Sequence, residues 1–236
     1  MRIGGLQRVS LIDFPGKIAA VAFTQGCNFR CQFCHNESLV IPEKFQSPMD
    51  EEEFFNFLVS RRGKLDAVVV SGGEPTLHVD IVEFFEKIKN LGFLTKLDTN
   101  GTRPDVLKNL CEKNLLDYVA MDVKHRFDKY DDISGVAVDI SAIAASIDLI
   151  KNSGVDYEFR TTVVPHFHRA DDIEAIASQL SGAKRFVIQE FVPDHAINGN
   201  LSGENSLFSP QNRETMDALA AFCKSHVEEF SMRSAS

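Results

Sequence analysis

The sequence predicts an α/β fold, an incomplete and open-sided (β/α)6 barrel with parallel strands, and three observations support it. Apolar, β-branched segments alternate with amphipathic helical segments, the alternation occurs six times, and no low-complexity linker interrupts it. Strands that alternate with helices form right-handed crossovers, which make the sheet parallel and place helices on its faces. Six repeats are too few to close an eight-stranded TIM-like barrel, so an open barrel is expected, with a doubly wound open sheet as the alternative.

The six predicted strands are rich in aliphatic and β-branched residues, and most of them end at polar or glycine-containing segments. They cover Lys17–Thr24, Asp66–Ser71, Phe93–Asp98, Asp117–Val123, Val155–Val164 and Lys184–Val192. In either architecture, ligands bind where the strands end and the loops begin. The chemistry is therefore expected at the carboxyl ends of these strands.

The predicted helices place apolar residues at helical spacing, and three of them have an N-cap candidate, namely Ser47, Thr102 and Asp139. The first helix starts at about Pro48, and the helix capped by Asp139 ends at Gly154. The other helices cover Val79–Leu91, Arg103–Asn114, about Ala170–Leu180 and about Pro210–Phe230.

Length and composition indicate an ordinary cytoplasmic protein with one domain over residues 1–236. Hydrophobic residues make up 44% of the chain and charged residues 25%, which is near the average for globular proteins. The sequence contains no apolar run of the roughly 18 residues that a membrane span needs, and the N-terminal segment lacks the apolar core of a secretory signal. A net charge of -9 argues against nucleic acid as a partner. A small ligand or a protein partner is favoured.

The segment 25–36 is expected to form a metal-binding loop directly after the first predicted strand. It holds Cys27, Cys31 and Cys34, whose spacing allows one short loop to surround three corners of a four-iron, four-sulfur cluster. Three protein ligands leave the fourth iron open to a substrate. The alternatives are a zinc site with His35 as fourth ligand and three core cysteines; Cys111 and the distant cysteine of the last helix, Cys223, are interpreted as ordinary thiols.

This loop resembles the signature of the radical S-adenosylmethionine (SAM) superfamily, with Phe33 just before the third cysteine. The following Cys-His-Asn is similar to the activating enzymes of glycyl radical enzymes. The stretch SLIDFPGKIAAVAFTQGCNFRCQFCHN resembles, more narrowly, the long form of the anaerobic ribonucleoside-triphosphate reductase activating proteins. The resemblance implies an enzyme in which a 4Fe-4S cluster cleaves SAM reductively to a 5′-deoxyadenosyl radical. That radical then takes a hydrogen atom from a glycine of a partner enzyme.

The resemblance also implies cofactor-binding residues in the cysteine loop and at the later strand ends. These are Phe33, Cys34, His35, Gly72, Gly73, Glu74, Asp98, Thr99, Asp122, Val123, Lys124, Arg160 and His195. In the family, the segment that matches Gly72–Glu74 lies against the SAM amino group. Lys124 is expected to meet the SAM carboxylate or ribose, and Asp98 and Asp122 to face its cationic side or a monovalent cation.

From the sequence alone, purely structural roles for these residues are also possible. The glycines suit a tight turn, and the charged residues suit a structural ion network. Arg160 pairs either with a carboxylate of the protein or with one of the ligand, while His166 and His168 are interpreted as loop residues.

Three functions compete, and the first is activation of anaerobic ribonucleotide reductase. The second is a radical SAM reaction on a small molecule, as in 7-carboxy-7-deazaguanine synthase, and the third is a non-catalytic iron-sulfur or zinc module. The stretch between Cys34 and the second predicted strand contains no further cysteine, which excludes inserted ferredoxin-like clusters there. Flavodoxin or ferredoxin is therefore expected to supply the electron directly.

Overall fold

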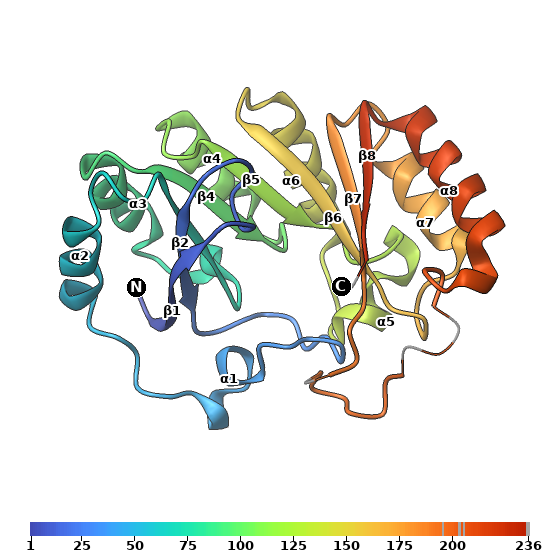
Figure 1. The fold of residues 1–236 in the computed structure, drawn as a ribbon, viewed down its shortest axis with the longest axis horizontal. Coiled ribbons are helices and arrows are strands. Elements are labelled where there is room, and N and C mark those ends of the chain that lie inside the picture. Colours follow the sequence, from blue (N-terminus) through green and yellow to red (C-terminus); the bar gives the residue numbers. More distant parts are fainter. Residues whose placement is uncertain (195, 203, 205, 235–236) are drawn as a thin grey trace.

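A computed structural model describes residues 1–194, 196–202, 204 and 206–234, which form one eight-stranded sheet in sequence order. The strands are β1 (Ile3–Ser10), β2 (Ala19–Thr24), β3 (Ala67–Gly72), β4 (Leu94–Thr99), β5 (Tyr118–Asp122), β6 (Asp156–Val163), β7 (Arg185–Glu190) and β8 (Glu229–Arg233). Only the β1–β2 pair is antiparallel. The sheet curves into an arc whose ends, β1 and β8, are not paired with each other (Figure 1). The prediction of an open, incomplete barrel is confirmed.

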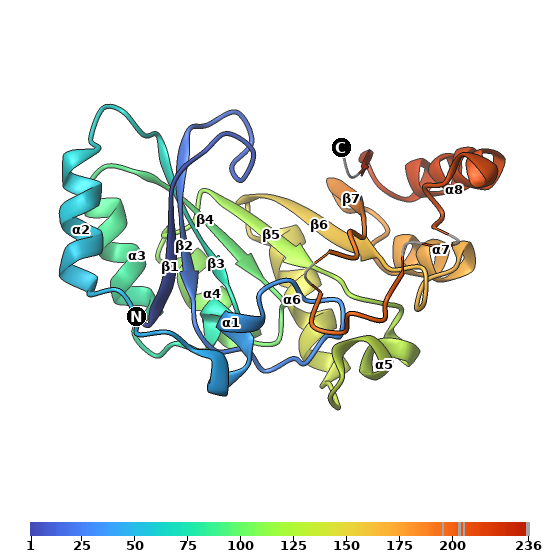
Figure 2. The same ribbon diagram turned by 60° about the horizontal axis from the view of Figure 1, so that its bottom comes forward.

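Six longer helices cover the outer, convex side of the arc (Figures 1 and 2). They are α2 (Glu51–Ser60), α3 (Ile81–Asn90), α4 (Pro104–Glu112), α6 (Ile140–Asn152), α7 (Ala170–Gln179) and α8 (Arg213–His226). Two short helices, α1 (Glu37–Val40) and α5 (Tyr130–Ser134), lie near the carboxyl ends of the strands, and 3-10 turns cover Pro42–Lys44, Pro75–Leu77, Phe127–Lys129 and Pro210–Asn212. None of the helices in the described part of the chain is long and apolar enough to span a lipid bilayer.

The main core lies between the helices and the convex face of the sheet, and alternation along each strand creates it. On β3, Val68 and Val70 are fully buried in this core, whereas the intervening Val69 belongs to a smaller cluster on the concave face. Phe14, from the β1–β2 hairpin, packs against Tyr118 in that smaller cluster. The two faces of the sheet therefore belong to two separate hydrophobic clusters.

Two strands were not predicted. The β1 segment carries two glycines and a half-exposed middle, so it lacks the apolar pattern of a strand and forms only because β2 offers a free edge. The last helix was predicted to reach Phe230, but it ends at His226, and residues Glu229–Arg233 pair with β7 as β8. Helical spacing alone does not separate a helix end from a short edge strand.

Two of the three predicted helix caps were wrong. Helix α2 is capped by Asp50, whose carboxylate accepts a hydrogen bond from the Glu52 N–H at 2.7 Å, and not by Ser47. The hydroxyl of Thr102 donates to Asn100 Oδ1 at 2.8 Å instead of capping α4. The Asp139 cap is confirmed, because its carboxylate accepts from the Ser141 and Ala142 N–H groups.

Candidate active site

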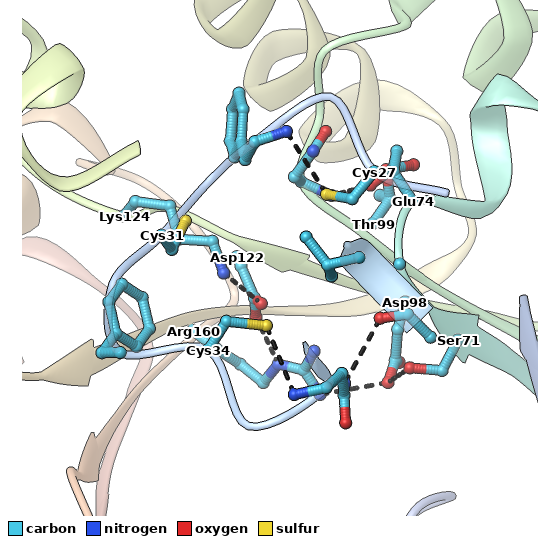
Figure 3. A pocket seen from close by; sticks show the side chains of 17 residues that line it. Cys27, Cys31, Cys34, Ser71, Glu74, Asp98, Thr99, Asp122, Lys124 and Arg160 are labelled. Atoms are coloured by element: carbon cyan, nitrogen blue, oxygen red, sulfur yellow. Dashed lines mark hydrogen bonds and ion pairs between the residues drawn. The ribbon is translucent and has the colours of Figure 1, made fainter. Parts of the chain in front are cut away.

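A cavity of about 230 Å³ opens at the carboxyl ends of the strands, between the cysteine loop and the concave face of the sheet (Figure 3). Its lining combines thiols from the loop after β2 with carboxylates, cations and glycines from β3, β4, β5, β6 and their loops. The lining residues are Cys27, Phe29, Cys31, Phe33, Cys34, Asn36, Val40, Ser71, Gly72, Gly73, Glu74, Asp98, Thr99, Asn100, Asp122, Lys124 and Arg160. Most of the residues predicted from the sequence therefore meet at one place.

The three clustered thiols are free and line this cavity, while the two isolated cysteines lie elsewhere on α4 and α8. Burial raises the pKa of Cys27 to about 12, although the Phe29 N–H hydrogen-bonds its sulfur. Burial likewise raises the pKa of Cys31 to about 11, against the opposing charge of Lys124. Such thiols become thiolates when a metal centre supplies positive charge at the sulfur.

Helix α5 supports the cysteine loop from one side. The Arg30 N–H donates to the Ser134 carbonyl at 2.7 Å, and the Phe29 ring meets the Tyr130 ring edge-on at 6.3 Å between centroids. Gly135 follows α5 with φ of 70°, and a Cβ there would lie 2.6 Å from the Arg30 carbonyl oxygen. The loop and α5 approach so closely that only glycine fits at that position.

The segment after β7 supports the loop from the other side, and it determines where His35 lies. The His35 ring stacks on Phe191 at 6.0 Å, and its Nε2 is 2.7 Å from the Val192 carbonyl oxygen. The Ile197 N–H also donates to the Cys34 carbonyl. His35 does not line the cavity, and its Nε2 is already engaged by the Val192 carbonyl. In the described residues no three His, Cys, Asp or Glu side chains are grouped to hold a metal ion, and this includes the three loop cysteines. The zinc alternative, with His35 as fourth ligand, therefore does not fit, and the predicted His195 lies outside the described residues.

Gly72 and Gly73 line the cavity, but their missing side chains serve the packing of the loop. A Cβ on Gly72 would lie 2.3 Å from the Thr24 nitrogen, and one on Gly73 would lie 2.1 Å from the Gly26 carbonyl oxygen. The Glu74 N–H donates to that same Gly26 oxygen at 2.8 Å. The two glycines thus allow the turn after β3 to pack directly on the backbone that leads into the cysteine loop.

Glu74 is fully buried, and its carboxylate connects the turns after β3 and β4. It accepts hydrogen bonds from the Thr76 backbone and hydroxyl, from the Thr99 hydroxyl at 2.7 Å and from the Asn100 N–H at 2.6 Å. Burial raises the pKa of this carboxyl group, and these donors oppose the shift. Both of its oxygens already have partners within the chain, so Glu74 shapes the cavity wall. The sequence interpretation missed Asn100, whose side chain bonds Asn28 in the cysteine loop at 2.8 Å, although both lie beside motif residues.

Four charged side chains that line the cavity belong to an ion network, which Lys96 extends by pairing with Asp98 at 3.0 Å. Asp122 pairs with Lys124 at 2.8 Å and with Arg160 at 2.9 Å, and Arg160 also lies 3.5 Å from Asp98. Burial disfavours the charge on Asp122, but Arg160 and Lys124 outweigh burial and hold its pKa well below its usual range. The Lys124 ammonium also lies 5.6 Å above the Phe33 ring. Val123, which lies between Asp122 and Lys124 in the sequence, is buried and does not line the cavity. Its N–H donates to the Arg160 carbonyl.

Comparison with known proteins places this arrangement in context. Residues 21–180 match the radical SAM superfamily. A Methanocaldococcus jannaschii protein, provisionally named as a glycyl-radical enzyme activating enzyme, is 38% identical over 239 residues, covering 98% of this chain and 95% of its own. The pyruvate formate-lyase-activating enzyme of Clostridium pasteurianum is 27% identical over 214 residues, with 84% of each chain covered.

A solved structure shows the same fold at low sequence identity. Streptococcus suis SuiB bound to S-adenosylmethionine superposes with a TM-score of 0.68 at 13% identity. The match covers 92% of this chain and 49% of SuiB, so this chain spans about half of that longer protein.

Proposed function

Because this chain belongs to the radical SAM superfamily and to its glycyl-radical enzyme activating enzymes, we propose that it activates anaerobic ribonucleoside-triphosphate reductase. Cys27, Cys31 and Cys34 would hold the 4Fe-4S cluster that the superfamily carries. The observation that supports this best is that the three free thiols line the same cavity as the paired charges of Asp122, Lys124 and Arg160 (Figure 3).

In chemical type the three thiols fit such a cluster, although they are not grouped for a metal ion in this structure. Soft thiolates are the ligands that iron-sulfur clusters prefer, and the described cavity wall offers no fourth cysteine to close the coordination. When bound, the cluster supplies the electron that breaks the bond between the SAM sulfur and C5′, which releases the 5′-deoxyadenosyl radical. The cavity wall contributes orientation and exclusion of water.

The charged wall is assigned to SAM. Lys124 and Arg160 are partly buried cations that favour a carboxylate, and Lys124 is proposed to bind the SAM carboxylate or ribose. Asp98 and Asp122 are proposed to face the cationic side of SAM. A monovalent cation at these two carboxylates would share them with Arg160, so SAM affinity measured in sodium, potassium and bulky organic cation buffers tests its presence.

The opening between β1 and β8 supports a macromolecular substrate. Because β1 and β8 do not pair with each other, we propose that a polypeptide segment reaches the concave face between them. The activating enzymes of glycyl radical enzymes act on a partner protein, and the reductase is proposed here from the resemblance of residues 10–36. Flavodoxin or ferredoxin is the proposed electron donor.

The test is anaerobic incubation of the reconstituted protein with dithionite, SAM and purified reductase. A glycyl-radical doublet in the electron paramagnetic resonance spectrum of the reductase is expected, together with one 5′-deoxyadenosine for each radical. If only pyruvate formate-lyase acquires the doublet, that enzyme is the partner and the reductase is not. Deoxyadenosine without a doublet on either protein, with turnover of a small molecule, would overturn the proposal.

A further inference from the structure

We propose that His168 is a positioning residue, which fixes Lys124 in the cavity through the backbone; this rests on the proposed binding of SAM at Lys124. His168 lies in the loop after β6 and is only 3% exposed. It does not line the cavity. Its effect on the cavity therefore has to pass through another residue.

Both ring nitrogens of His168 bind backbone groups. The Val164 N–H donates to Nδ1 at 3.0 Å, so Nδ1 is the acceptor and the ring proton is on Nε2. Nε2 then donates to the carbonyl oxygen of Lys124 at 2.9 Å. One neutral imidazole thus connects the loop after β6 with the residue that carries the cavity's ammonium group.

Lys124 needs this bond because its peptide lies outside the sheet. The pairing of β5 with β6 ends at Asp122 and Arg160. Asp122 lies two positions before Lys124 in the chain. The Lys124 N–H donates to the Tyr130 hydroxyl at 3.1 Å, and its carbonyl accepts from His168. Two buried side chains therefore take the place of ladder partners and define the starting point of the Lys124 side chain.

A second histidine holds His168 in this orientation. The His125 ring stacks on it with centroids 4.7 Å apart. His125 accepts from the Arg126 N–H at its Nδ1 and donates from Nε2 to the Phe167 carbonyl at 3.1 Å. The two rings thereby fasten the loop after β5 to the loop after β6, and each keeps the tautomer that its backbone partners dictate.

The consequence concerns SAM affinity more than cluster binding. The ammonium of Lys124 must lie between Asp122 and the Phe33 ring, and a shift of its backbone would weaken its contact with a bound carboxylate. The cysteine loop is held by other contacts, from α5 and from the segment after β7. Iron content should therefore not depend on His168.

The experiment is a double-mutant cycle between His168 and Lys124, read as the SAM dissociation constant of the oxidised, reconstituted protein by equilibrium dialysis. H168A is expected to raise the dissociation constant about tenfold in the wild-type background and less than twofold in the K124M background. H168Q, whose amide can still donate to the Lys124 carbonyl, is expected to stay within about threefold. H166Q is the matched control, because His166 is exposed and two residues away, and it is expected to match the wild type.

Iron content and thermal unfolding are measured for every variant. An equal tenfold effect of H168A in both backgrounds would overturn the inference, since His168 would then act independently of Lys124. An unchanged dissociation constant for H168A would also overturn it. If H168A loses iron or unfolds, the contrast between H168Q and H166Q decides. A rise in the dissociation constant of up to threefold for H168Q that disappears in the K124M background supports the coupling, and a rise of equal size in both backgrounds overturns it. A wild-type protein that does not bind SAM would instead overturn the proposed function, and the inference with it.

Discussion

The two faces of the sheet differ in the kind of side chain that each carries. On β6, Phe159 points to the convex side and is fully buried among helix residues, while the next residue, Arg160, points to the concave side and joins three carboxylates. The convex face is satisfied by apolar side chains of suitable volume. The concave face near the cavity carries buried charges that are costly unless each has a partner. Where a protein buries charges in this way beside a cavity, a ligand site is a natural explanation.

The concave face is itself divided. Its β2 and β3 part is apolar, with Ala19, Val21 and Val69 packed near Phe14 of the hairpin. The charges gather toward the carboxyl ends of β4, β5 and β6, which is where the cavity opens. Charged side chains also occur elsewhere on the sheet, such as Asp156 and Arg185 at the amino ends of β6 and β7, but those do not line this cavity.

The largest expected effect is the loss of activity when a thiol in the cavity is replaced, compared with a thiol outside it. Cys31→Ala is expected to abolish 5′-deoxyadenosine formation and to lower iron content, because the cluster loses one of three protein ligands. Cys111→Ser on α4 is the control, and it is expected to retain both, since that thiol lies outside the cavity. Iron analysis and chromatography of deoxyadenosine measure the contrast, and full activity of Cys31→Ala would contradict the cluster assignment.

The second prediction compares adjacent residues on opposite faces of β6. Arg160→Met removes the cation that Asp98 and Asp122 share but leaves Lys96 and Lys124 beside them. Activity is therefore expected to fall more than 100-fold and the free energy of unfolding by about 1–3 kcal/mol. Phe159→Leu on the convex face is expected to cost about 1–2 kcal/mol and to leave kcat/KM within a few-fold. Denaturant unfolding and SAM-cleavage kinetics provide the measurements. Equal loss of activity in both variants would remove the functional distinction between the faces.

The third prediction concerns Glu74, which joins two turns instead of contacting the solvent. Glu74→Gln places an amide NH₂ where a carboxylate oxygen now accepts from the Asn100 N–H or the Thr99 hydroxyl. The variant is expected to lose about 1–3 kcal/mol of unfolding free energy and to raise the KM for SAM several-fold, while kcat changes less. A variant with lower kcat and unchanged KM would instead indicate that Glu74 touches the reacting groups.

The smallest effect is a pH dependence of stability. Burial lowers the pKa of His168 to about 4, and the charge of the neighbouring His125 acts in the same direction, whereas Asp172 favours the charged ring. The unfolded ring titrates near pH 6.5, so the unfolded state binds the proton first. The stabilisation is therefore complete above about pH 6.5 and is lost as the pH falls toward 4.

Comparison with His168→Gln isolates this contribution. The unfolding free energy of the wild type is expected to fall more steeply than that of the variant between pH 6.5 and 4, by on the order of 2 kcal/mol. Urea unfolding at several pH values measures both slopes. Parallel curves would show that His168 does not titrate as its buried position implies.

Sequence reasoning located the cavity residues well because their motifs sit at strand ends. Lys124, Arg160 and Asp98 were named from the sequence and meet within one ion network. The cofactor role of His35 stays a prediction; in the structure its ring stacks on Phe191, a contact between residues far apart in the chain. Sequence reasoning treated His168 as a loop residue, because a lone histidine carries no signal until its two backbone partners are known.

The sequence by itself determined the parallel α/β architecture, the cysteine loop and the order of polar strand ends, since periodicity and spacing are local properties. Tertiary structure alone decided the two edge strands, the packing role of Gly72 and Gly73, and the saturation of Glu74 by neighbouring turns. The physical reason is that edge pairing, close backbone approach and hydrogen-bond satisfaction depend on atoms brought together from distant segments. No pattern within one segment encodes them.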